Sequence, residues 1–202
     1  MKSLNEYLTE GFKLGKNYKK PYNYHPTTKD ELKDIIKELI AKRGNEADLN
    51  DIDTSEITDM SQLFQNSDFN GDISRWDVSN VEDMNDMFYK CKFNGDLSKW
   101  DVSNVEDMTG MFATCNFTGE NGDISDWDVS NVKNMESMFE HSKYNGDISR
   151  WNVSKVENML NMFKRSKFAG DLSKWNVSKD VDVIDMFEKS PLDGKEPEWY
   201  EE

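Results

Sequence analysis

Two columns of acidic residues are the part of this sequence whose types and spacing could support chemistry. The first column is Asp72, Asp96, Asp123, Asp147 and Asp171, and the second is Asp77, Asp101 and Asp128, continued by Asn152 and Asn176. Stacked carboxylates could bind Ca²⁺, because hard cations take several oxygen ligands. They could instead accept hydrogen bonds from the amides of turns. We favour the second role because the GGxGxD pattern of calcium-binding repeats is absent, and we predict no metal and no cofactor.

Two cysteines and two histidines are the other candidates for chemistry. Cys91 and Cys115 share a column that is otherwise serine, so adjacent repeats could bring the thiols near disulfide range. We favour free, mostly buried thiols, which suit a reducing compartment. No nucleophile-base pair and no phosphate-binding loop accompanies His25 or His141. The sequence therefore predicts a protein that is not an enzyme.

These residues recur because the chain repeats about every 24 residues. The interval is set by Trp76, Trp100, Trp127, Trp151, Trp175 and Trp199. Columns of glycine and phenylalanine keep the same steps, including one step that is three residues longer. The extra residues are 118–120, between the Phe and Gly columns. A fixed period of this length is typical of stacked repeat architectures.

Each unit contains two local patterns. Val81, Met84, Met87, Phe88 and Cys91 follow a helical period, which predicts a short helix. Ser residues with Glu three positions later, as in Ser79 and Glu82, predict a capping box at its start. The preceding Asn-Gly predicts a turn, and the Ile and Trp after it predict a very short strand.

Units of this kind bury their apolar faces only by stacking. The predicted fold is therefore an α/β repeat solenoid, a right-handed, leucine-rich-repeat-like stack of about six strand-turn-helix units. The pattern TTKDELKDIIKELIAKRG predicts an N-terminal capping helix, with Thr28 and Glu31 as its capping box and Gly44 as its stop. We divide the chain into a peptide and basic linker (1–25), the capping helix (26–47), the repeats (48–190) and a C-terminal cap with an acidic tail (191–202).

The repeated line F-N-G-D-I-S-x-W-D-V-S-N-V-x-x-M-x-x-M-F resembles the BspA-type leucine-rich-repeat proteins, also described by their mycoplasma-lipoprotein-like repeat. The resemblance runs from Asp48 to about Trp199. It implies a leucine-rich-repeat-like solenoid used for protein contact, often in adhesion at a bacterial surface. The first 25 residues contain no continuous apolar core of an export signal, so we predict a cytoplasmic or virion location.

The first ten residues, MKSLNEYLTE, resemble the capsid-targeting peptide of internal head proteins of T-even-like phages. That resemblance implies cleavage after the Leu8-x-Glu10 motif, between Glu10 and Gly11. It also implies packaging into a phage head and possible delivery into the host. The alternative from the residues alone is a short amphipathic segment that docks on the domain.

Charge is distributed unevenly along the chain. Residues 1–47 carry ten Lys or Arg and seven Asp or Glu, a net charge of +3, whereas the remainder carries 15 against 33, a net charge of −18. Acidic repeats would repel a phosphate backbone, so we predict no nucleic-acid binding. We also predict no membrane span and leave the oligomeric state open.

The residue before each Trp varies while the Trp does not. This row is Arg75, Lys99, Asp126, Arg150 and Lys174, followed by Glu198. An exposed Trp column could bind sugars or a partner, but its regular interval beside a Val column predicts core packing. We therefore predict a non-enzymatic protein-binding module in which the variable row contacts an unidentified protein; the alternative function is that of a phage internal head protein.

Overall fold

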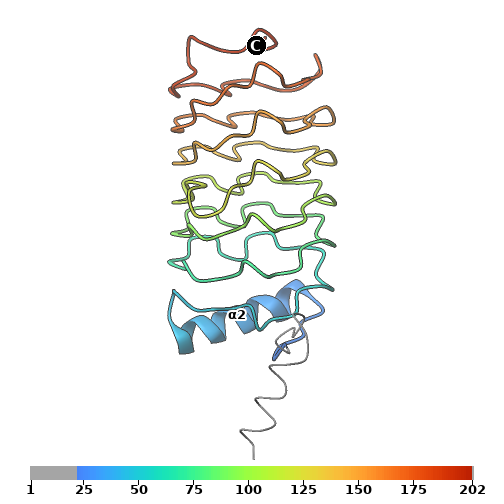
Figure 1. The fold of residues 1–202 in the computed structure, drawn as a ribbon, viewed down its shortest axis with the longest axis vertical. Helices are drawn as coiled ribbons and strands as arrows, with labels where there is room; N and C mark the ends of the chain where they lie inside the picture. Colours follow the sequence, from blue (N-terminus) through green and yellow to red (C-terminus); the bar gives the residue numbers. More distant parts are fainter. Residues whose placement is uncertain (1–21, 202) are drawn as a thin grey trace, which may run out of the picture.

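The computed structural model describes residues 22–201, and one helix within them, α2 (Lys29–Arg43), lies at the N-terminal end of the molecule (Figure 1). Thr28 caps α2 by accepting a hydrogen bond from the Glu31 amide, and Gly44 ends it with a φ of 85°. Leu32, Ile36 and Leu39 form its buried face. The predicted helix and both of its caps are therefore observed. No helix in the described part of the chain is long and apolar enough to cross a membrane.

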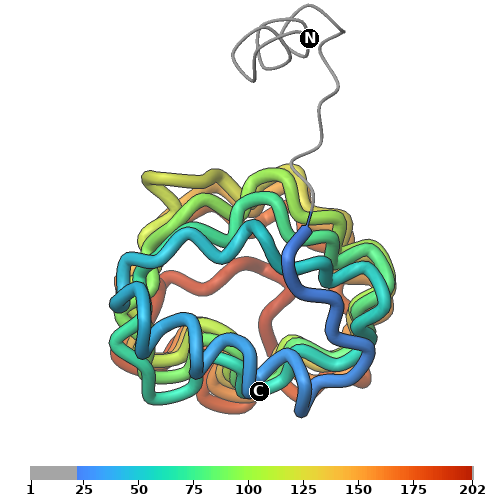
Figure 2. The backbone as a smooth tube through the Cα atoms, turned by 90° about the horizontal axis from the view of Figure 1, so that it is seen from below, coloured from blue at the N-terminus to red at the C-terminus, as the bar shows by residue number. Residues whose placement is uncertain are grey.

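The repeats form flat, irregular coils that stack along the long axis of the molecule (Figure 1). Viewed along that axis, the coils nearly superimpose (Figure 2). Isolated parallel bridges hold successive coils together, joining Asp59, Asp83, Asp107, Asn134, Asn158 and Asp182 in turn. Two further bridges join Tyr24 to Ile52 and Asp48 to Asp72.

The interior is filled by columns of aromatic and sulfur-containing side chains. The Phe column is Phe64, Phe88, Phe112, Phe139, Phe163 and Phe187. Consecutive rings in this column are stacked, with centroids 5.6 to 5.9 Å apart. Offset stacks at such distances are favourable arrangements of aromatic rings. The stacking of Phe on Phe, expected from the repeat, is thus present.

The prediction of an α/β solenoid built from strand-turn-helix units is wrong. In residues 22–201 the repeats contain no helix, and their inter-coil pairs are isolated bridges rather than strands. Where a helix was expected, Asp86 and Lys90 have φ values of 52° and 53°, in the left-handed region that interrupts a right-handed helix. The expected capping box is absent too, because the Glu82 amide donates to the Thr58 carbonyl of the preceding coil.

The amides of this segment show why no helix forms. Those of Met84, Asp86, Phe88 and Lys90 donate to carbonyls of the next coil, at 2.7 to 3.0 Å. The intervening amides close turns within the coil, for example from Cys91 to the Phe88 carbonyl. Turns separated by left-handed residues return apolar side chains to the interior at i, i+3, i+4 and i+7, which is also the spacing on a helix. The periodicity was therefore compatible with both structures.

The predicted short strand is likewise replaced by a turn. The Trp76 amide donates to the Ile73 carbonyl at 3.1 Å, and the same turn recurs at each later Trp up to Trp175. The indole Nε1 of Trp76 donates to the Leu49 carbonyl of the preceding coil at 3.1 Å. Each equivalent indole makes the same inter-coil bond. The Trp column therefore belongs to the core, as its regular interval predicted.

Candidate binding surface

The two predicted Asp columns hold the outer turns of the coils. The Asp72 carboxylate accepts from the Ser74 amide at 2.9 Å, and the Asp77 carboxylate accepts from the Ser79 amide at 3.1 Å. The later coils repeat the first contact up to Asp171 and the second up to Asn152, whereas no such contact is observed for Asn176. The structural interpretation of these columns is confirmed, since each observed side chain accepts a bond from a turn amide. Within residues 22–201, no group of three or more His, Cys, Asp or Glu is placed to hold a metal ion.

A third polar column was missed by the sequence analysis. It consists of the bridge residues Asp59, Asp83, Asp107, Asn134, Asn158 and Asp182. Each accepts a hydrogen bond from the amide two residues later, as Asp83 does from Asn85 at 2.8 Å. Burial raises the pKa of Asp83, and the neighbouring carboxylates of Asp59 and Asp107 raise it further. The signal was visible as an Asp or Asn before the first Met of the first five units, and before Val183 in the last.

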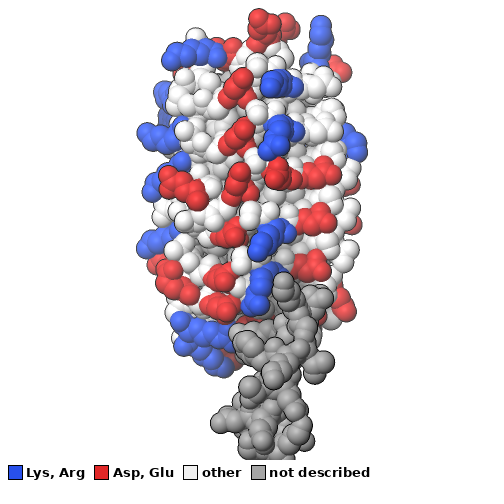
Figure 3. Space-filling model, in the orientation of Figure 1, with Lys and Arg blue, Asp and Glu red and all other residues white. Residues whose placement is uncertain are grey.

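The predicted contact residues stand in one exposed row along the stack. They are Arg75, Lys99, Asp126, Arg150 and Lys174. Within the row, a guanidinium nitrogen of Arg150 lies 3.2 Å from a carboxylate oxygen of Asp126. Figure 3 shows that charged side chains on one face form lengthwise rows of this kind. Because both side chains of the pair are exposed, their attraction is weak and does not close the row to a partner.

The row is supported from beneath by the Trp column. The Trp that follows each row residue is buried, with exposed fractions of 3 to 5% for the five residues from Trp76 to Trp175. On either side in the sequence, the row residues are flanked by Asp or Asn side chains that are bonded to turn amides. These hydrogen bonds hold the backbone of the row in place, whereas the charge of the side chain varies from one row position to the next.

A polar groove of about 470 Å³ runs over the N-terminal half of the stack. Its lining residues are Glu56, Thr58, Asn80, Glu82, Asn104, Glu106 and Asn131. The three Asn side chains donate to serine carbonyls of the preceding coil at 2.7 to 2.8 Å. Their amide groups are therefore used to hold adjacent coils together.

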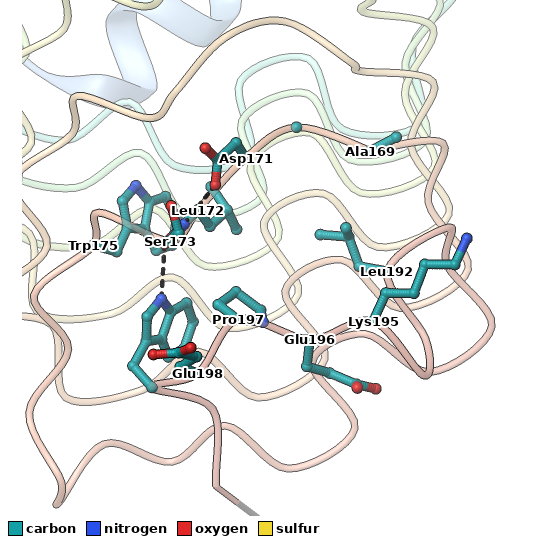
Figure 4. Close-up of a pocket in the computed structure, with 12 residues that line it drawn as sticks. Ala169, Asp171, Leu172, Ser173, Trp175, Leu192, Lys195, Glu196, Pro197 and Glu198 are labelled. Atoms are coloured by element: carbon teal, nitrogen blue, oxygen red, sulfur yellow. Dashed lines mark hydrogen bonds between the residues drawn. The ribbon is translucent and has the colours of Figure 1, made fainter.

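A larger cleft, of about 670 Å³, lies at the C-terminal end between residues 169–175 and 192–199 (Figure 4). Trp199 closes one side: its indole Nε1 donates to the Leu172 carbonyl at 2.8 Å, and its ring stacks on Trp175 with centroids 6.2 Å apart. Leu192 lines the cleft as well, and Lys195, Glu196 and Glu198 supply charge. The sequence analysis treated this segment only as a terminal cap.

The other candidate residues do not assemble into a reactive centre in the described part of the chain. Cys91 and Cys115 are free and buried, and burial raises their thiol pKa values to about 11 and about 12. His25 lies 3.4 Å from an Asp53 carboxylate oxygen, whereas His141 occupies an exposed turn of a later coil. The proposed processing residues Leu8, Glu10 and Gly11 lie outside the described residues.

The comparisons with known proteins agree with a mycoplasma-like repeat. A search of curated proteins and a search of solved structures found no match. A family model matches two segments, residues 33–121 and 116–199, which together cover most of the chain. The chain therefore belongs to the family described as Mycoplasma protein of unknown function, DUF285.

Proposed function

We propose that this protein is a non-enzymatic binding module that contacts another protein through the row Arg75, Lys99, Asp126, Arg150 and Lys174. The observation that carries the proposal is the exposure of these five side chains in one row, each followed by a buried Trp. A framework that is constant in its core and variable at its surface provides a rigid surface whose specificity is set by the exposed residues.

The charges of the row define the kind of partner it fits. Four of its five side chains are cationic, and the anionic one, Asp126, sits at the centre beside Arg150. An acidic surface with a central cationic group would complement this pattern. Because the row is exposed, its charges would remain accessible to water in the complex. We therefore expect these charges to affect strongly the rate of association with the partner and the dependence of that rate on salt.

The resemblance to BspA-type repeat proteins supports the proposal, because that family implies protein contact. The alternative of a phage internal head protein depends on residues 1–10, and no observation on the described residues favours it. Mass spectrometry of the mature N-terminus in virus particles would test it, with a start at Gly11 as the expected product of cleavage.

The binding proposal is tested by site-specific crosslinking in the source cells. A photoreactive amino acid replaces Lys99 in one variant and the exposed His141, which lies outside the row, in a matched control. We expect one protein to be crosslinked at position 99. We expect this crosslink to be lost when the charges of Arg75 and Lys174 are reversed by replacing both residues with Glu. Equal crosslinking from both positions, or a crosslink that survives the charge reversals, would contradict the proposal.

A further inference from the structure

The polar groove over the N-terminal half of the stack is lined by two columns of side chains. The first column is Glu56, Asn80, Asn104 and Asn131, and it continues as Lys155 and Lys179. The second column is Thr58, Glu82 and Glu106, and it continues as Lys133, Glu157 and Val181. The groove spans the part of both columns that precedes their lysines, so none of its lining residues is a cation.

The side-chain oxygens of the groove are open acceptors. Asn80 and Asn104 use their Nδ2 atoms to donate to serine carbonyls at 2.8 and 2.7 Å, and their Oδ1 atoms accept no hydrogen bond from residues 22–201. Glu56 and Glu82 are exposed, and neither forms a salt bridge within the described part of the chain. The groove therefore offers acceptors and negative charge that the repeats themselves do not use.

The molecule itself shows which chemical group fits these columns. The Lys133 Nζ lies 2.6 Å from a Glu106 carboxylate oxygen, and the Lys155 Nζ donates to the Asn131 Oδ1 at 2.7 Å. In both pairs the lysine comes from the coil that follows its acceptor. An ammonium group is a compact cation with three donors, which suits both a carboxylate and an amide oxygen. The equivalent acceptors of the preceding coils have no such lysine.

Residues 11–20 carry charges that complement the groove. This segment, GFKLGKNYKK, contains four Lys and no acid, a net charge of +4. Lys13, Lys16 and Lys19 are three residues apart. In a polyproline II conformation they would share one face at intervals of about 9.3 Å, because that helix has three residues per turn and rises about 3.1 Å per residue. Two coil steps of about 4.8 Å cover about 9.6 Å, so successive lysines would match acceptors two coils apart.

The segment is tethered close enough to reach the groove of its own molecule. Tyr24 pairs with Ile52 in the first coil. Glu56 is four residues after Ile52 and therefore lies at most about 14 Å from it. Lys16 is eight residues before Tyr24, and eight extended residues span up to about 28 Å. The tether gives the segment a high effective concentration at its own groove, which favours a contact within one molecule.

We propose that residues 11–20 bind along the polar groove of their own molecule. The ammonium groups of Lys13 and Lys16 contact the open carboxylates and amide oxygens, in the manner of Lys133 and Lys155. Because all of these groups are exposed, each ion pair is weak and the contact is sensitive to salt. The proposal concerns a different surface from the partner-binding row, and neither depends on the other.

Carbodiimide crosslinking of the full-length protein at low salt tests the contact, because this reagent joins a lysine amine to a carboxylate only where the two groups meet. Products with the mass of a monomer are isolated, and their links are mapped by mass spectrometry. We expect amide links from Lys13 or Lys16 to Glu56 or Glu82. Raising the salt from about 50 to 500 mM should reduce the yield of these links several-fold.

Two matched variants test whether the charge of the groove attracts the segment. Glu82→Gln removes one carboxylate of the groove and should lower the yield of the link at Glu56 about threefold. Glu46→Gln is the control, because Glu46 is exposed near the same end of the stack but does not line the groove. This control should leave the yield at Glu56 unchanged. Circular dichroism melts establish that the variants are folded.

NMR provides a second measurement that does not depend on the crosslinking reagent. Replacing Lys13 and Lys16 together by Gln should shift the side-chain amide signals of Asn80 and Asn104, because their Oδ1 atoms lose an ammonium donor. The side-chain amide of Asn176, exposed near the opposite end of the stack, should keep its signal.

Three results would overturn the proposal. The first is the absence of links from Lys13 and Lys16 to the groove, or links that fall equally on Glu46. The second is a groove link found only in crosslinked dimers, which would place the segment on a second molecule. The third is an unchanged signal of Asn80 and Asn104 in the folded variant that lacks the two lysines.

Discussion

Replacing Thr114 by Gly should stabilise the protein, and the sign of this effect distinguishes a left-handed turn from a helix. Thr114 has a φ of 56° and lies at an exposed position in the middle of the stack. Left-handed conformations cost a residue with a side chain about 1–2 kcal/mol, and β-branched residues are the least suited to them. The amide of Thr114 donates to the Glu140 carbonyl at 2.8 Å, a bond that Gly retains.

The expected gain in the free energy of unfolding is about 1 kcal/mol. Gly releases the strain of about 1–2 kcal/mol but gives back about 0.5–1 kcal/mol through the greater entropy of the unfolded chain. Urea unfolding followed by tryptophan fluorescence measures the change through the midpoint of the transition. Lys99→Gly is the control, because Lys99 is exposed and lies outside the left-handed region. This control should lose about 0.5–1 kcal/mol.

A helix would reverse the expected result at Thr114. Gly in a helix interior is about 1 kcal/mol less favourable than Ala and less favourable than Thr. If Thr114→Gly destabilises the protein as much as Lys99→Gly does, the left-handed turn at this position is refuted.

Three further predictions concern the core, an ion pair and the thiols. Phe112→Ala should cost about 3–5 kcal/mol in urea unfolding, because the ring is fully buried between two stacked neighbours. The Arg43 guanidinium, bonded to both Asp51 carboxylate oxygens, lowers the pKa of Asp51 from about 3.8 to about 2. A lowered folded-state pKa stabilises the fold above the unfolded value, so about 2 kcal/mol should be lost as the pH falls from about 4 to about 2. A pH series of unfolding curves that is parallel for the wild type and Asp51→Asn would contradict this. Cys91 and Cys115 should resist alkylation in the folded protein, as followed by mass spectrometry, and rapid labelling would contradict their burial.

The sequence analysis identified the repeat frame, α2 and the buried columns, because each depends on interval and hydrophobicity alone. It could not separate turns from helices, since both place Met84, Met87 and Phe88 on one face. The distinction depends on the φ of residues such as Asp86, and it depends on whether an amide finds its acceptor in its own coil or the next. These are properties of the stack rather than of one unit.

The candidate binding features were predictable to different degrees. The exposed row followed directly from the position of its residues beside a buried Trp column. The groove lined by Glu56, Asn80 and Glu82 did not, because its shape depends on how adjacent coils stack.

The central claim is that the repeats are stacked turns whose amides bond to the next coil. The most direct test is an NMR measurement of scalar couplings across hydrogen bonds, which identify the carbonyl that each amide contacts. The structure predicts a coupling from the Phe88 amide to the Met111 carbonyl of the next coil, a hydrogen bond of 3.0 Å. A coupling from Phe88 to the carbonyl of Met84, four residues earlier, would instead show a helix and contradict the account.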